Sequence, residues 1–212
     1  MAENLASLVL ALADSLDWDR FGLVGHSWGG STAVHVAAAH ASRIRALVLV
    51  DSGHLDYADQ PGARLDETLD ELAANMEAAR RRSPDRASVA TDLELPIDDP
   101  VVEAFMAGMT GDGGGGLVSR TTGASRAAAM FHLMRARQSE RWAALAAGGF
   151  PTLLLLATKP EDLKAMNEAA AARFAAAVPQ AEVRFVDASH SVITDLRDDF
   201  GSTVANWLAT IG

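Results

Sequence analysis

The segment GHSWG at residues 25–29 constrains the fold of this chain more than any other, because it joins a short apolar run to an Ala-rich helical stretch. The apolar run at 21–25 predicts a strand, and residues 28–40 predict a helix. A serine in so tight a turn takes a strained backbone conformation that projects its hydroxyl from the end of the strand. The turn brings strand and helix so close that we expect glycine two residues before and two after the serine, with Gly30 easing the same contact.

Helices and strands are predicted to alternate on both sides of this turn. Leucines and a valine recur at helical spacing over residues 3–16, ahead of the turn. The continuous apolar run at 44–50 is typical of a parallel strand buried on both faces. Strand, helix and strand in this order predict a βαβ unit with a right-handed crossover. The pattern resumes late in the chain, with strands expected at 152–157 and 182–186 and helices at 162–177 and 193–209.

The middle of the chain has a different character, which divides the sequence into three parts. Helical patterns there are separated by polar loops, and they occur at 65–82, 99–109 and 124–146. The glycine-rich run at 111–116 predicts a flexible linker that could serve as a hinge. We therefore expect a core formed by residues 1–54 and 149–212, with a helical insertion over 55–148.

Composition excludes several classes of protein and site. The chain has 212 residues, no cysteine and a formal net charge of −10. Without cysteine there is no disulfide, thiolate metal site or cysteine nucleophile. The negative charge argues against nucleic acid and anionic membrane surfaces as partners. The first residues lack the basic region of a signal peptide and no apolar run reaches the length of a membrane span, so we expect a cytoplasmic protein.

Four features together resemble the α/β-hydrolase fold superfamily. They are the strand, turn and helix around residues 25–30, the strand that ends at Asp51, the strand after Pro151, and the loop that holds Ser189 and His190. The resemblance implies an α/β fold with a mostly parallel sheet of the α/β-hydrolase type, into which a helical cap is inserted. It also identifies residues 25–30 as a nucleophile elbow, in which Ser27 is the nucleophile.

A serine hydroxyl needs a base to remove its proton, and that base is usually a histidine oriented by a carboxylate. In this superfamily the serine, the acid and the histidine follow one another in that order along the chain. Of six histidines, His190 alone lies where this order requires the base. Strand alternation predicts that the His26 side chain points away from the neighbourhood of Ser27. His54 and His132 belong to the middle region, where a structural role is more common than contact with a substrate.

Several carboxylates compete for the role of the acid. In many members of the superfamily the acid lies three residues after a Gly that ends the strand following the cap, but that position here holds Pro160. Glu161 and Asp162 follow, although a carboxylate just after a proline is also an ordinary helix start. Some relatives place the acid after the strand that follows the elbow helix, where Asp51 lies. We prefer Asp51, with Asp162 or Glu161 as the alternative and Asp56 or no acid as the remaining readings.

The oxyanion hole of such enzymes uses two backbone donors. Trp28, directly after the serine, supplies one of them. The other usually comes from a loop after an earlier strand, often marked by a His-Gly sequence, and the 24 residues before Gly25 contain no such segment. The resemblance therefore predicts an N-terminally truncated sheet of about four strands. Its elbow strand would be an open edge through which copies of the chain could associate, and a natural short form that completes its sheet in this way is the alternative to a fragment.

The resemblance implies a serine hydrolase that cleaves an ester or related small acyl substrate through an acyl-enzyme, without a metal or organic cofactor. An aminopeptidase similar to prolyl iminopeptidases is one alternative, because Trp after the serine also occurs there, and lactone or carbon–carbon bond hydrolysis is another. A non-catalytic partner protein on a degenerate hydrolase fold is the alternative from a different class. The side chains expected to contact substrate are His26, Trp28, Met106, Met130 and Phe131, and a core role is the alternative for those in the cap.

Overall fold

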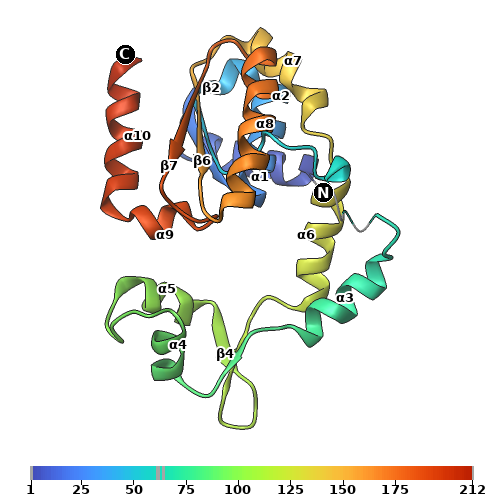
Figure 1. The fold of residues 1–212 in the computed structure, drawn as a ribbon, viewed down its shortest axis with the longest axis vertical. Helices are drawn as coiled ribbons and strands as arrows, with labels where there is room; N and C mark the ends of the chain where they lie inside the picture. The colour runs from blue at the N-terminus through green and yellow to red at the C-terminus, as the bar shows by residue number, and fades with distance from the viewer. Residues whose placement is uncertain (1, 61–62, 64, 212) are drawn as a thin grey trace. The chain divides into compact units, whose positions relative to one another are not determined.

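The computed structural model describes residues 2–60, 63 and 65–211, which form two compact units. The first unit comprises Met1–Ala63 and Arg135–Gly212, and the second comprises Arg64–Met134. Each unit has a sheet of its own, with four strands in the first unit and three in the second among the described residues (Figure 1). The second unit lies inside the insertion that the sequence predicts over 55–148.

The sheet of the first unit is entirely parallel, with the strand order β1-β2-β6-β7. The prediction of a mostly parallel α/β sheet is therefore confirmed. Parallel strands all end at the same edge of a sheet, so the residues that follow β1 and β2 are neighbours. The backbone N–H of Ser27 donates to the carbonyl of Val50 at 3.2 Å. The strands are β1 (Phe21–His26), β2 (Ile44–Val50), β6 (Thr152–Ala157) and β7 (Ala181–Val186).

Helices cover both faces of this sheet, because its central strands are apolar on both sides. Leu47 and Leu49 of β2 pack in one buried cluster, whereas Val48 and Val50 pack in another. The first cluster draws on α1 (Ala2–Ser15), α2 (Trp28–Ala39), α7 (Ser139–Gly148) and α8 (Glu161–Ala177). The second draws on α9 (Val192–Leu196) and α10 (Asp198–Thr210). In the described part of the chain, no helix is both long and apolar enough to cross a membrane.

The first strand forms an edge of this sheet, as the sequence predicts. Apolar side chains near that edge are exposed, on β1 and on α1 with the turn after it. An edge strand presents unpaired N–H and C=O groups along its outer side. The exposed side chains are Leu8, Leu12, Leu16, Trp18 and Val24, and each has an exposed fraction between 46% and 66%.

The second unit contains the helices expected of a helical cap and, in addition, a small antiparallel sheet that the sequence did not predict. The strands of this sheet have only two or three residues each, too few for an alternating pattern to stand out in the sequence. They are β3 (Arg82–Ser83), β4 (Met109–Gly111) and β5 (Leu117–Ser119), in the order β3-β5-β4. The helices are α3 (Leu69–Ala78), α4 (Arg86–Asp92), α5 (Pro100–Ala107) and α6 (Gly123–Arg135), the last ending one residue beyond the unit.

Three further expectations differ from the structure. The glycine-rich run at 111–116 is the turn of the β4–β5 hairpin rather than a flexible linker. The carboxylate of Asp112 organises that turn, because it accepts the N–H groups of Gly114 and Gly116 at 2.8 and 2.9 Å. The helix predicted over 124–146 is two helices, α6 and α7. The helix predicted over 193–209 is also two, α9 and α10, because Arg197 between them has a φ of 44°.

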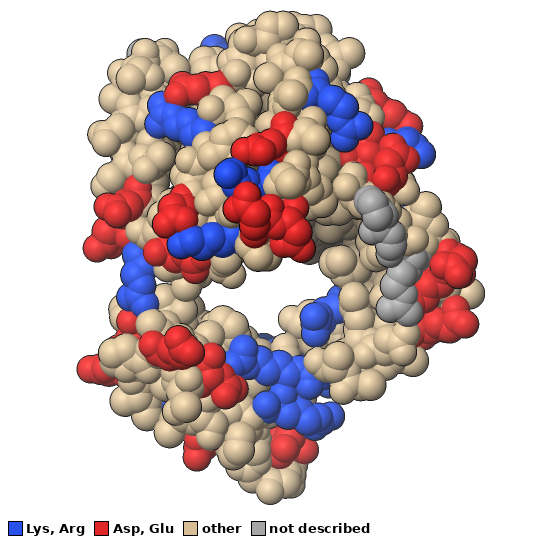
Figure 2. Space-filling view, viewed as in Figure 1, with Lys and Arg blue, Asp and Glu red and all other residues tan. Residues whose placement is uncertain are grey.

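The surface charge agrees with the acidic composition. Figure 2 shows acidic side chains distributed over both units, with basic side chains interspersed among them. Several of these charges form exposed ion pairs, such as Arg43 with Asp14 and Arg137 with Asp59. Exposed pairs of this kind contribute about 0–1 kcal/mol each, so they add little to the stability of the fold.

Candidate active site

The turn between β1 and α2 holds Ser27 in a strained backbone conformation, with φ 53° and ψ −124°. Glycine is required two residues earlier, since a Cβ on Gly25 would lie 2.5 Å from the carbonyl oxygen of Gly29. The expectation that Gly29 is equally constrained is wrong, because a Cβ there would meet nothing within 4 Å. The second constrained position is Gly30, where a Cβ would lie 2.6 Å from the Cβ of Ser52. Strand β1, helix α2 and the loop after β2 therefore meet around this turn.

Gly25→Ala is expected to destabilise the protein by about 1–3 kcal/mol, the usual cost of forcing extra atoms into a packed site. Its methyl group would overlap backbone atoms, which cannot rotate away as a side chain can. Gly29→Ala is the matched control, with open space and a helical position that favours Ala over Gly. The midpoint of thermal unfolding measures both effects. Equal destabilisation by the two substitutions would contradict the steric argument.

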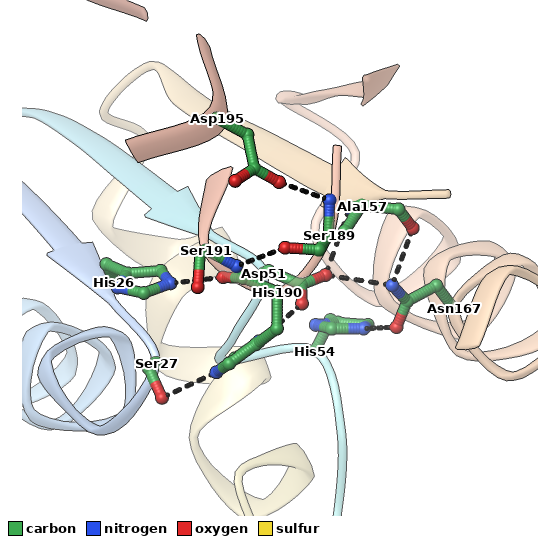
Figure 3. A network of polar contacts seen from close by, with 10 residues as sticks. All are labelled: His26, Ser27, Asp51, His54, Ala157, Asn167, Ser189, His190, Ser191 and Asp195. Atoms are coloured by element: carbon green, nitrogen blue, oxygen red, sulfur yellow. Dashed lines mark hydrogen bonds and ion pairs between the residues drawn. The ribbon is translucent and has the colours of Figure 1, made fainter. Parts of the chain in front are cut away.

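Ser27, His190 and Asp51 form a continuous line of hydrogen bonds (Figure 3). The distance from His190 Nε2 to Ser27 Oγ is 2.8 Å, and that from His190 Nδ1 to Asp51 Oδ2 is 2.6 Å. An ionised carboxylate only accepts hydrogen bonds, so Nδ1 of His190 carries the proton. Nε2 is therefore free to accept the hydroxyl proton of Ser27. Asp51 follows β2 directly, and His190 lies in the loop between β7 and α9.

The environments of Asp51 and His190 favour opposite charges on the two side chains. Burial alone would raise the pKa of Asp51, but hydrogen bonds from His190, from the backbone N–H of Ala157 and from Asn167 hold that pKa below its usual value. The hydrogen bond with Asp51 raises the pKa of His190, against the opposing effect of partial burial. The Asp51 side chain is 2% exposed, whereas that of His190 is 51% exposed. The histidine can thus take up a proton beside a buried, ionised carboxylate.

The other candidate acids lie elsewhere. Glu161 and Asp162 are in the first turn of α8, where carboxylates favour a helix N-terminus. The Asp56 carboxylate accepts the backbone N–H of Ser139 at 2.9 Å, at the start of α7. Among the described residues, the carboxylate hydrogen-bonded to His190 is that of Asp51.

His26 contacts the loop that carries His190. Its Nε2 lies 2.7 Å from the carbonyl oxygen of His190, so this nitrogen donates, and the two imidazole rings are 5.1 Å apart. The expectation that its side chain points away from the neighbourhood of Ser27 was therefore wrong. Strand alternation gives the direction of a side chain at the end of β1, but it does not give the path of a loop more than 160 residues later.

The remaining predicted contact residues divide between the two units. Trp28 is the first residue of α2, and its side chain is 39% exposed. Met106 lies in the second unit and packs against a small cluster that includes Val89 and Val102. Met130 and Phe131 are half-buried on α6, also in the second unit. Met106 therefore packs in a hydrophobic core, which was the alternative to substrate contact that the sequence analysis gave for the side chains of the cap.

Asp195 and Asn167 were not predicted from the sequence, whereas His54 was expected to have a structural role. Asp195 accepts the backbone N–H of Ser189 at 2.7 Å and so anchors the loop of His190 (Figure 3). Asn167 and His54 are both fully buried and continue the hydrogen-bond line behind Asp51. One signal for Asn167 was available, since it lies three, four and seven residues before the buried Ala170, Ala171 and Phe174 of α8. A polar residue on an apolar helix face is unusual and indicates a specific partner.

Comparisons with known proteins agree with this architecture. The family model described as alpha/beta hydrolase fold matches residues 2–195. Over 100 residues the chain is 38% identical to the lipase LipV of Mycobacterium tuberculosis, and this match covers 45% of the chain but only 36% of the lipase. Among solved structures, E-2-(acetamidomethylene)succinate hydrolase is similar with a TM-score of 0.71 and 21% identity, covering 98% of this chain and 74% of the other. The enol-lactonase of Burkholderia xenovorans LB400 gives a TM-score of 0.62 and 23% identity, with coverage of 99% and 73%.

Proposed function

Because the chain belongs to the alpha/beta hydrolase fold family, we propose that it is a serine hydrolase in which Ser27 is the nucleophile, His190 the base and Asp51 the acid. The observation that carries the proposal is the unbroken hydrogen-bond line from Ser27 through His190 to a buried carboxylate. The strained backbone of Ser27 supports it further, since a structural serine needs no such strain. The names of the similar proteins include a lipase and a lactonase, so the substrate class proposed is an ester or a related acyl compound.

The geometry supports a two-step acyl transfer. The oxygen of Ser27 attacks the acyl carbonyl as its proton passes to Nε2 of His190. Asp51, hydrogen-bonded at Nδ1, stabilises the imidazolium that forms. The proton then passes to the leaving alcohol, and water activated by His190 releases the acid and frees Ser27.

The residue directly after Ser27 supplies one hydrogen-bond donor for the oxyanion that develops on the substrate. The backbone N–H of Trp28 begins α2, where free N–H groups and the positive end of the helix dipole favour an anion. A single oxyanion donor is worth about 10²–10³ in rate, so this N–H is a substantial part of the proposed catalysis.

Hydrolysis of p-nitrophenyl esters of graded chain length tests the substrate class, with proline p-nitroanilide as the probe for an aminopeptidase. Turnover of the esters without release of nitroaniline would support the proposal. Turnover of the anilide alone would favour the aminopeptidase reading instead. A folded protein that acts on neither and reacts with no serine-directed probe would favour a non-catalytic role.

We expect the acid limb of the kcat/KM profile to lie above pH 6.5, the ordinary pKa of a histidine. His190 accepts the proton of Ser27 only when it is neutral, so activity falls as pH decreases through its pKa. Asp51 raises that pKa, which moves the limb upward rather than downward. Initial rates on a neutral ester over about pH 5 to 9 measure the limb. A midpoint below pH 6.5 would contradict the assignment of His190 as a base paired with Asp51.

A further inference from the structure

Two buried polar side chains continue the hydrogen-bond line on the far side of Asp51 (Figure 3). Asn167 Nδ2 lies 2.8 Å from Asp51 Oδ1, and Asn167 Oδ1 lies 2.9 Å from His54 Nε2. Both side chains have no exposed surface. His54 follows Asp51 by three residues, whereas Asn167 comes from α8. Hydrogen bonds thus tie the acid to its own loop and to a helix distant in the sequence.

The chemistry of the groups fixes the direction of every hydrogen bond in this line. The Asn167 amide nitrogen also donates to the carbonyl oxygen of Ala157 at 3.1 Å, and neither that oxygen nor a carboxylate can donate in return. Oδ1 of Asn167 is then an acceptor, so Nε2 of His54 must carry a proton. A flipped amide would place its oxygen against two other oxygens, which makes the observed orientation the only one with all contacts favourable.

Asn167 donates a hydrogen bond to Oδ1 of Asp51, the carboxylate oxygen that does not contact His190. Oδ1 accepts from Asn167 and from the backbone N–H of Ala157 at 3.1 Å, which leaves Oδ2 for His190. Burying a carboxylate costs free energy unless hydrogen bonds compensate. Among the described contacts, Asn167 is the one side chain that donates a hydrogen bond to Asp51 Oδ1. The backbone of Asp51 has a φ of 46°, so its position is also under strain.

We infer that Asn167, oriented by His54, is a positioning residue that holds the Asp51 carboxylate toward His190. This inference rests on the proposed function, because it assigns the pair a task in the reaction of Ser27. Neither residue lies in the line between Ser27 and Asp51, so both act through Asp51 rather than on a substrate. A buried His–Asn pair of this kind keeps the acid ionised and oriented while the imidazole gains and loses its proton.

Asn167→Leu tests the inference, since it keeps a similar volume and removes the donor. We expect kcat to fall about 10–100-fold with little change in KM, comparable to the loss of hydrogen-bond partners behind metal-ligating histidines. Without the donor on Oδ1 the carboxylate can turn away from His190, which weakens the hydrogen bond that raises the pKa of His190, so His190 should titrate at a lower pH. The titration of His190 is followed by proton NMR of its imidazole ring, a measurement that does not depend on catalytic turnover. Purely structural support would lower stability without moving this titration.

His54 offers a matched pair of variants that keeps the test decisive if Asn167→Leu does not fold. His54→Gln retains an N–H donor close to the position of Nε2, so its kcat and its His190 titration should stay near those of the wild type. His54→Leu removes that donor and should shift both in the same direction as Asn167→Leu. Among the described residues, the other titratable groups close to Asp51 and His190 include His26, Tyr57 and Asp195, and Arg173 lies near His54. All variants retain these groups.

The outcomes separate the inference from the proposed function. A downward shift of the His190 titration in the leucine variants, absent in His54→Gln, supports the positioning role. Folded leucine variants whose His190 titration and kcat equal those of the wild type would overturn it. A wild-type protein that turns over no ester would overturn the proposed function, and the NMR titration would still decide whether Asn167 holds the acid.

Discussion

Ser27→Ala is expected to abolish ester turnover and covalent labelling by a fluorophosphonate probe. The probe reacts with a serine oxygen whose proton a neighbouring base can remove, and His190 Nε2 lies 2.8 Å from that oxygen. Removal of the nucleophile from a complete triad lowers kcat by on the order of 10⁶-fold, so residual activity should be at the limit of detection. Labelling is read from intact-protein mass spectrometry, and turnover from hydrolysis of a p-nitrophenyl ester.

Ser202→Ala provides the control for this experiment. Ser202 lies on an exposed part of α10, so the same chemical change there should leave labelling and turnover intact. A Ser27→Ala protein that still takes the label would show that another residue reacts. A folded wild-type protein that takes no label would count against the whole proposal.

Asp51→Asn should lower kcat by about 10⁴-fold, the effect of this change in a serine triad of known mechanism. An amide nitrogen facing His190 can donate to Nδ1, which favours the imidazole form protonated at Nε2. That form cannot accept the proton of Ser27. The loss of the negative charge also removes the effect that raises the pKa of His190, so the acid limb of any residual activity should move to lower pH.

Asp162→Asn is the matched comparison, because the sequence offers Asp162 as an alternative acid. Its position in the first turn of α8 leads us to expect a change in kcat of no more than a few-fold. Steady-state kinetics on one ester compares the two variants directly. Equal mild effects would argue against both carboxylates, and a larger loss in Asp162→Asn would reverse the assignment.

The main architecture was predictable because its signals are local. A continuous apolar run such as that at 44–50 reflects burial on both faces of a strand. The helical spacing over 3–16 predicted the helix, although Leu8 and Leu12 are exposed and the buried positions are Ala6 and Ala13. The boundaries of the four strands of the parallel sheet agree with the prediction to within one residue. The small sheet of the second unit was missed, since its strands are too short to show a period, and Asp112 turns the glycine run into a hairpin through its own carboxylate.

What the sequence by itself determined is the strained turn around Ser27 and the order of strands and helices on either side of it. The sterics of such a turn depend on near neighbours, above all on Gly25 and Gly30. Only the tertiary structure decided which carboxylate faces His190 and which side chains hold that carboxylate in place. His190 and Asp51 are 139 positions apart and Asn167 and Asp51 are 116 apart, so packing of the sheet, and no local pattern, brings them together.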